Sequence, residues 1–229
     1  MRADPVRLGV LVSGRGSNLG AVLDAVADRR LSDVQPVLVI SNRAGVPALG
    51  VAADHGVPSQ VLARTDFASA DARDLAIGKA LADSGAELAL LAGYDQLLRQ
   101  PFFGAFRGRT INIHPSLLPR HGGRGMVGLA VHQAVLAAGD SVTGVTVHDV
   151  TEALDAGPPI AQVEVPVLSG ESAEELAERV LAVEHRTLVD VLARLAAEGS
   201  DQGASASMTA ASPPTGASRA PHERRRTHA

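Results

Sequence analysis

The sequence predicts an α/β protein with a single doubly wound, mostly parallel sheet and helices on both faces. Short apolar runs alternate with segments whose apolar residues recur at helical spacing. Residues 87–92 are apolar apart from Glu87, as in strands that are buried on both faces. The first apolar run passes directly into a glycine loop and then a helical pattern, an order typical of doubly wound folds.

The individual elements follow from this alternation. Strands are expected where short apolar runs end at turn residues, at 8–12, 36–40, 59–62, 87–92, 109–113, 142–148 and 160–165, the last two paired around a loop that holds Asp155. Helices are expected at 19–27, capped by Ser17 or Asn18, and at 45–55, 70–84, 129–138 and 172–197. The last of them opens with a capping-box pattern, Ser172-Ala173-Glu174-Glu175.

Composition limits the classes of function. The 229 residues are 45% hydrophobic, enough for one large domain with its own core. The chain has no cysteine, which excludes disulfides and thiolate chemistry, and its first residues lack the apolar stretch of a signal peptide. A net charge of −4 and 2% aromatic residues disfavour nucleic acid as a partner, and no run is long enough for a membrane span. We therefore expect a cytoplasmic protein, monomer or homodimer, that acts on small molecules.

Composition also divides the chain in two. Residues 1–199 carry the strand and helix pattern, whereas residues 200–229 are rich in Ser, Ala, Pro and Arg and offer almost nothing to bury. We expect a folded domain over 1–199 and a disordered tail over 200–229.

The glycine loop Ser13-Gly14-Arg15-Gly16-Ser17-Asn18 fits two kinds of site. It lacks the third glycine of the dinucleotide fingerprint, and no acidic residue follows the second strand, so a NAD or NADP oxidoreductase is disfavoured. Free N–H groups at Gly16, Ser17 and Asn18 could instead hold a phosphate at the start of the first helix. A tight turn without a ligand is the alternative.

Two further motifs carry polar groups at strand ends. The run Asn112-Ile113-His114-Pro115-Ser116-Leu117-Leu118-Pro119 is followed about forty residues later by Leu154-Asp155-Ala156-Gly157-Pro158. An amide, an imidazole and a carboxylate together suit acyl-group transfer, because one can stabilise an oxyanion while the others handle a proton. The alternative is a purely structural role, in which the polar residue at the strand end caps the following segment and Asp155 is a turn residue.

Together the runs NIHPSLLP, LDAGP and SGRGSN closely resemble the 10-formyltetrahydrofolate-dependent transferases over roughly residues 7–197. The resemblance implies a Rossmann-like formyltransferase fold and, from the glycine loop, glycinamide ribonucleotide as the formyl acceptor. It also implies 10-formyltetrahydrofolate as co-substrate, with no tightly bound cofactor and no metal.

The resemblance assigns roles residue by residue. Asn112 and a protonated His114 would be catalytic, with Asp155 keeping His114 charged and moving a proton through water. Gly16, Ser17, Asn18 and Glu184 would bind the phosphate and ribose of the acceptor. The folate would contact Tyr94, Asp95, Gln96, Leu97, Leu98, Thr151, Glu152, Ala153 and Leu154. His148 would line or support the site, while His121 has no clear role and His132 belongs to a helix.

Some alternatives stay open. A deformylase or a transferase with another amine acceptor, such as methionyl-tRNA, would share Asn112, His114 and Asp155, although such relatives usually carry an additional domain. A regulatory module that binds ligands without turnover would have little use for all three. The glycine-rich stretch 120–128 departs from the pattern of relatives, and Arg64 and Arg73 are both candidates for a ribonucleotide contact.

Overall fold

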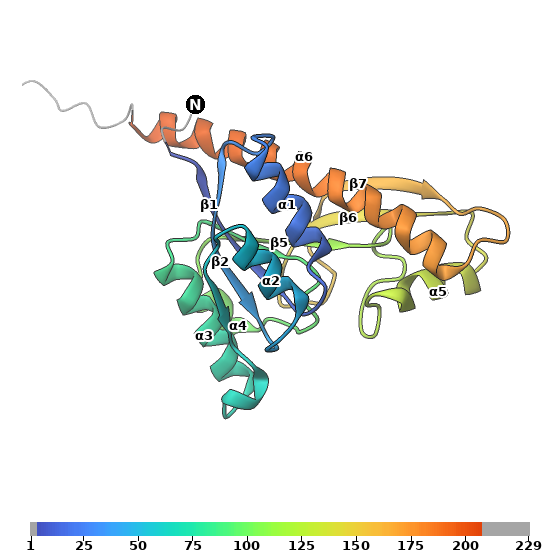
Figure 1. Ribbon diagram of the computed structural model, residues 1–229, viewed down its shortest axis with the longest axis horizontal. Helices are drawn as coiled ribbons and strands as arrows, with labels where there is room; N and C mark the ends of the chain where they lie inside the picture. Colours follow the sequence, from blue (N-terminus) through green and yellow to red (C-terminus); the bar gives the residue numbers. More distant parts are fainter. Residues whose placement is uncertain (1–3, 208–229) are drawn as a thin grey trace, which may run out of the picture.

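A computed structural model of the chain describes residues 4–207, with side chains over 4–198. These residues form one seven-stranded sheet in the order β3-β2-β1-β4-β5-β6-β7 (Figure 1). Its strands are β1 (Val6–Val12), β2 (Val34–Ser41), β3 (Ser59–Val61), β4 (Leu88–Leu91), β5 (Arg109–His114), β6 (Val142–Asp149) and β7 (Pro159–Pro166). The first five run parallel, and β6 and β7 continue the sheet as antiparallel neighbours. The predicted mostly parallel sheet is confirmed.

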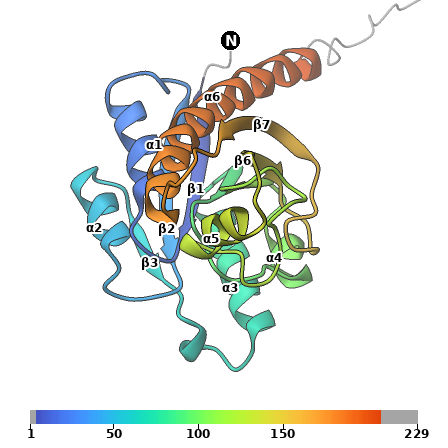
Figure 2. The ribbon, with the colours of Figure 1, turned by 90° about the vertical axis from the view of Figure 1, so that its right-hand side faces the viewer.

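Helices cover both faces of this sheet (Figure 2). One face packs against α1 (Ser17–Ala27), α2 (Pro47–Asp54), α5 (Leu129–Ala137) and α6 (Ala173–Ser207). The other packs against α3 (Ala70–Asp83) and α4 (Gln100–Ala105), with the short 3-10 helix η1 (Arg64–Asp66) leading into α3. The central strands are therefore buried on both sides, which explains why their sequences are apolar throughout. None of the helices within the described residues is long and apolar enough to cross a membrane.

The strand order reverses beside β1. The chain first lays β2 and β3 on one side of β1, and α3 then returns it across the sheet so that β4 lies on the other side. The loops that follow β1 and β4 diverge at this point and leave a crevice at the carboxyl ends of the strands, where open α/β sheets bind their ligands. The loop after β1 is the predicted glycine loop.

Three details differ from the sequence-based expectations. Helix α1 is capped by Gly16, with φ 81°, and not by the side chain of Ser17 or Asn18. A β-carbon at Gly16 would lie 2.7 Å from the α-carbon of Ala48, so glycine allows α1 and α2 to approach closely. Helix α4 was missed, because its six residues are too few for a helical pattern.

The third difference concerns the C-terminal helix. The capping box at its start is present: the Glu175 carboxylate accepts from the Ser172 backbone N–H at 2.8 Å, and the Ser172 hydroxyl accepts from the Glu175 N–H at 3.2 Å. The helix then continues to Ser207, past its expected end near Ala197, so residues 200–207 of the expected disordered tail are helical. Each further residue of an established helix adds one hydrogen bond, which favours such an extension. Residues 208–229 lie outside the described part of the chain.

Candidate active site

Asn112 and His114 lie on the same face of β5, near its carboxyl end. Side chains alternate along this strand: Ile111 and Ile113 enter the core beneath α5 and α6, and the two polar residues therefore point to the opposite face. His114 is buried, and Asn112 is partly exposed. The predicted orientation of the pair to one side is confirmed.

His148 orients the amide of Asn112. The two residues are paired across the antiparallel strands β5 and β6, and Asn112 Nδ2 lies 3.0 Å from His148 Nε2. His148 Nδ1 lies 2.9 Å from the carbonyl oxygen of Asp149 and must carry the proton of that contact. In the neutral ring with this tautomer, Nε2 accepts one N–H of Asn112, and the other N–H of the amide can donate to a ligand. His148 thus supports the candidate site directly.

Asp155 reaches the two histidines from the loop between β6 and β7. Its carboxylate lies 3.9 Å from His114 Nδ1 and 3.8 Å from His148 Nε2, and it accepts a hydrogen bond from the Gly123 N–H at 2.8 Å. Asp155 has φ 51°, a conformation that aspartate tolerates better than most residues. A β-carbon at Gly157 would lie 1.7 Å from the carbonyl oxygen of Asp149, so the glycine of the LDAGP motif lets this loop fold back on β6.

The protonation state of His114 differs from the expectation. Burial lowers the pKa of its imidazole, and the opposing effects of the His121 carbonyl and the Asp155 carboxylate do not reverse this shift. The shift favours the neutral ring in the free protein, which is opposite to the expectation that Asp155 keeps His114 charged. Its Nε2 lies 2.9 Å from the backbone oxygen of His121 and must donate there. Nδ1 consequently presents a lone pair toward Asp155.

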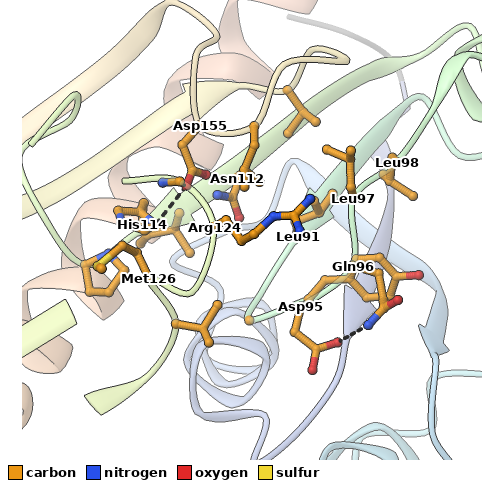
Figure 3. A pocket seen from close by; sticks show the side chains of 18 of the residues that line it. Leu91, Asp95, Gln96, Leu97, Leu98, Asn112, His114, Arg124, Met126 and Asp155 are labelled. Atoms are coloured by element: carbon orange, nitrogen blue, oxygen red, sulfur yellow. Dashed lines mark hydrogen bonds and ion pairs between the residues drawn. The ribbon is translucent and has the colours of Figure 1, made fainter. Parts of the chain in front are cut away.

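A cavity of about 510 Å³ opens beside these groups (Figure 3). Asn112, His114 and Asp155 form part of its wall, and Arg124 reaches across it toward Leu91 and Leu97. All but one of the residues expected to bind folate line this cavity, namely Tyr94, Asp95, Gln96, Leu97, Leu98, Thr151, Ala153 and Leu154. Glu152 is the exception and is exposed to solvent.

The loop after β4 is held firmly on its protein side. Asp95 pairs with Arg43, accepts from Asn42 Nδ2 at 2.7 Å, and its N–H donates to the Ser13 hydroxyl at 3.0 Å. Arg73 is buried against Asp74 and donates to the side-chain oxygen of Gln96 at 3.0 Å. These side chains bond to other parts of the protein and position the loop. The backbone N–H and C=O groups of the loop are therefore the ones available to a ligand in the cavity.

A second cavity of about 480 Å³ lies at the start of α1. Gly16, Ser17, Asn18 and Glu184 all line it, as the predicted acceptor site requires. Asn18 Nδ2 donates to the Glu184 carboxyl at 3.3 Å, while its own side-chain oxygen is buried without a partner. The free N–H groups at the start of α1 give this cavity an anion-binding end.

Two side chains of the cavity walls were missed in the sequence. His132 on α5 is buried, its Nδ1 has no hydrogen-bond partner, and it lines the second cavity. Arg15, the variable position of the glycine loop, lines both cavities. His132 lies in an ordinary helical pattern, and Arg15 occupies a loop position that no motif specifies. Neither could therefore be recognised as a site residue from the sequence. Arg64 and Arg73 line neither cavity.

Glu184 gives a pH-dependent prediction. Burial raises the pKa of its carboxyl to about 7 from an ordinary value of 4.5, against the opposing effect of the Asn18 hydrogen bond. A group whose pKa is raised by folding stabilises the fold fully at pH values below its pKa in the unfolded chain. This stabilisation is lost as the pH rises through its pKa in the folded protein. We expect the melting temperature of Glu184→Gln to fall less than that of the wild type between pH 5 and 8, by a few degrees. Parallel curves for the two proteins would contradict this assignment.

The comparisons with known proteins agree with this geometry. A family model described as formyl transferase matches residues 6–192. The chain belongs to the formyl transferase family. The resemblance carried by NIHPSLLP, LDAGP and SGRGSN is thereby confirmed, and all the residues of the candidate site fall within the matched region of this formyl transferase.

Individual relatives differ in length. This formyl transferase is 43% identical over 191 residues to the trifunctional purine biosynthetic protein adenosine-3 of Drosophila pseudoobscura pseudoobscura, a match over 83% of the chain but 14% of that protein. It is 36% identical over 176 residues to the phosphoribosylglycinamide formyltransferase of Escherichia coli strain K12, covering 77% of the chain and 80% of the relative. The crystal structure of glycinamide ribonucleotide transformylase 1 from Symbiobacterium toebii is similar with a TM-score of 0.80 at 38% identity, over 86% of this chain and 90% of that one.

Proposed function

We propose that this formyl transferase moves the formyl group of 10-formyltetrahydrofolate to the primary amine of glycinamide ribonucleotide, a step of de novo purine biosynthesis. The observation that carries the proposal is the common wall of the two cavities, to which Gly14, Arg15, Gly93, Ile113, Pro115 and Gly128 all contribute. A donor in the first cavity and an acceptor in the second would meet beside Asn112 and His114. The names of the relatives support this choice of acceptor.

The first cavity suits the folate. Its apolar wall, with Leu91, Leu97, Leu98 and Val150, would hold the ring system, and the backbone of the loop after β4 would supply directional hydrogen bonds. The loop 151–154 would close the opposite side, with Glu152 in contact only at its outer edge.

The second cavity suits the ribonucleotide. Its phosphate would bind at the N–H groups of Gly16, Ser17 and Asn18, where the dipole of α1 favours an anion. Glu184 would accept hydrogen bonds from the ribose hydroxyls, with His132 as a further polar contact on the same wall.

The reaction is an addition followed by an elimination. The amine nitrogen attacks the formyl carbon, a carbon–nitrogen bond forms, and the carbonyl oxygen becomes an oxyanion that the free N–H of Asn112 stabilises. Neutral His114 accepts the proton of the attacking amine at Nδ1, and Asp155 then stabilises the imidazolium across the 3.9 Å gap. The bond from the formyl carbon to folate N10 breaks as that nitrogen receives the proton.

This chemistry requires no electron transfer and no Lewis acid, so we propose that no cofactor is held tightly and that 10-formyltetrahydrofolate acts as a co-substrate. Among residues 4–198, no group of three or more His, Asp or Glu is placed to hold a metal ion. We further propose a cytoplasmic monomer or homodimer that acts on these small molecules alone.

A formyl transfer assay with three acceptors tests the function. We expect the purified protein to consume 10-formyltetrahydrofolate in the presence of glycinamide ribonucleotide, and not with water or methionyl-tRNA. Release of formate in water would indicate a deformylase, and formylation of the tRNA would indicate a different amine acceptor. Binding of both ligands without turnover would instead favour a regulatory module.

A further inference from the structure

The loop 120–125 holds two groups of the proposed catalytic site. The carbonyl oxygen of His121 accepts the Nε2–H of His114 at 2.9 Å, and the N–H of Gly123 donates to Asp155 at 2.8 Å. Two backbone atoms that are two residues apart therefore fix the imidazole and the carboxylate relative to each other. A shift of this loop would move both groups at once.

The loop is anchored on its far side by Asp140, in the turn between α5 and β6. The Asp140 carboxylate accepts from His121 Nε2 at 2.7 Å and pairs with Arg120. The side chain of His121 is largely buried, and that of Asp140 is 9% exposed, so the contact is shielded from solvent. The Ser116 hydroxyl adds a hydrogen bond to the carbonyl oxygen of Arg120 at 2.6 Å.

The backbone at His121 needs such an anchor. Its φ is 52°, in the left-handed region that a residue with a β-carbon occupies only at a cost of roughly 1–2 kcal/mol. This conformation directs the His121 carbonyl oxygen at His114, while the imidazole of the same residue points to Asp140. The hydrogen bond from His121 to Asp140 on one side therefore maintains the hydrogen bond from His114 to the His121 carbonyl on the other.

We propose that Asp140 is a positioning residue for catalysis, which acts through His121 to hold the imidazole of His114 in its reactive orientation and tautomer. Asp140 lines neither cavity and contacts neither Asn112 nor His114. Its effect passes through one side chain and one backbone carbonyl. The inference rests on the proposed function, because it assigns a role in the proton transfer described above.

The surroundings of His114 set the expected direction of the effect. Burial lowers the pKa of His114, and the imidazoles of His148 on β6 and His121 lower it as well. The backbone carbonyl of His121 and the carboxylate of Asp155, from the turn between β6 and β7, raise it. His132 on α5 interacts electrostatically with His114. If the His121 carbonyl swings away, its contribution is lost and the pKa of His114 should fall further.

Asp140→Ala tests the proposal by kinetics. We expect kcat to fall roughly ten- to hundredfold with both KM values within a few-fold, since misplaced catalytic groups affect turnover more than binding. The acid limb of the kcat profile should move to lower pH. His121→Ala should have a similar effect, and the double variant should be little worse than either single variant. Arg120→Ala should change little, because the side chain of Arg120 is exposed.

Two controls keep the test specific. Asp28→Ala removes a surface aspartate that pairs with Arg30 and lines neither cavity, and it should leave kcat unchanged. NMR titration of the His114 ring in wild type and Asp140→Ala measures the predicted pKa change without substrate. An unchanged titration, an unchanged kcat, or an equal loss in Asp28→Ala would overturn the role of Asp140. A wild type that forms no formylated product would refute the proposed function instead, and the titration would still test the contact.

Discussion

We expect Asn112→Ala, His114→Ala and Asp155→Asn each to lower kcat by about a hundredfold or more, with both KM values within a few-fold. Removal of a preorganised group that acts on the developing charge typically costs roughly 3 kcal/mol, because that interaction forms chiefly in the transition state. Asparagine at position 155 keeps an oxygen for the Gly123 N–H and removes only the charge beside His114. Steady-state kinetics with both substrates varied would measure the effect.

Coupling between these residues provides a sharper test. His114 and Asp155 are proposed to handle one proton together, so the double variant should lose far less than the product of the single effects. His55→Ala is a matched control, since His55 also pairs with an aspartate, Asp24, but lines neither cavity. Near-normal kcat with raised KM in the single variants, or losses that simply multiply, would identify three independent binding contacts and refute the mechanism.

Gly16→Ala should weaken binding of glycinamide ribonucleotide at least about tenfold and also lower the melting temperature. The new β-carbon would lie 2.7 Å and 2.8 Å from two carbons of Ala48, and a φ of 81° adds roughly 1–2 kcal/mol of backbone strain. To relieve the contact, the start of α1 must move away from α2, and the N–H groups proposed to hold the phosphate move with it. Calorimetric titration with each substrate separates this local effect from general damage.

Gly45→Ala is the matched control for this variant. Gly45 also has a positive φ, 67°, but a β-carbon there meets no atom within 4 Å, and the residue lines neither cavity. It should show the cost in stability alone, with both affinities near those of the wild type. If Gly16→Ala weakened folate binding as strongly as acceptor binding, or weakened neither, the phosphate site would have to be sought elsewhere.

The sequence was sufficient for the parts of this protein that depend on local pattern. Apolar runs, helical spacing and turn residues predicted all seven strands and the main helices, because a buried parallel strand and an amphipathic helix each impose their period on the chain. The glycine loop that holds Gly16 after β1, and the position of Asn112 and His114 near the end of β5, were predicted for the same reason. The three short motifs were also enough to indicate the formyl transferase family.

Other features depended on contacts between segments far apart in the chain. The lowered pKa of His114 results from its burial, and the orientation of its ring from a carbonyl seven residues away. The role proposed for Asp140 depends on a contact with His121, nineteen residues away in the chain. His132 lies on an ordinary helical stretch and reaches the second cavity only because α5 packs beside α6. Protonation, the walls of a cavity and the support of a catalytic group are set by the surroundings of a side chain. Those surroundings exist only in the folded protein, because chain neighbours supply few of the atoms within reach of a buried residue.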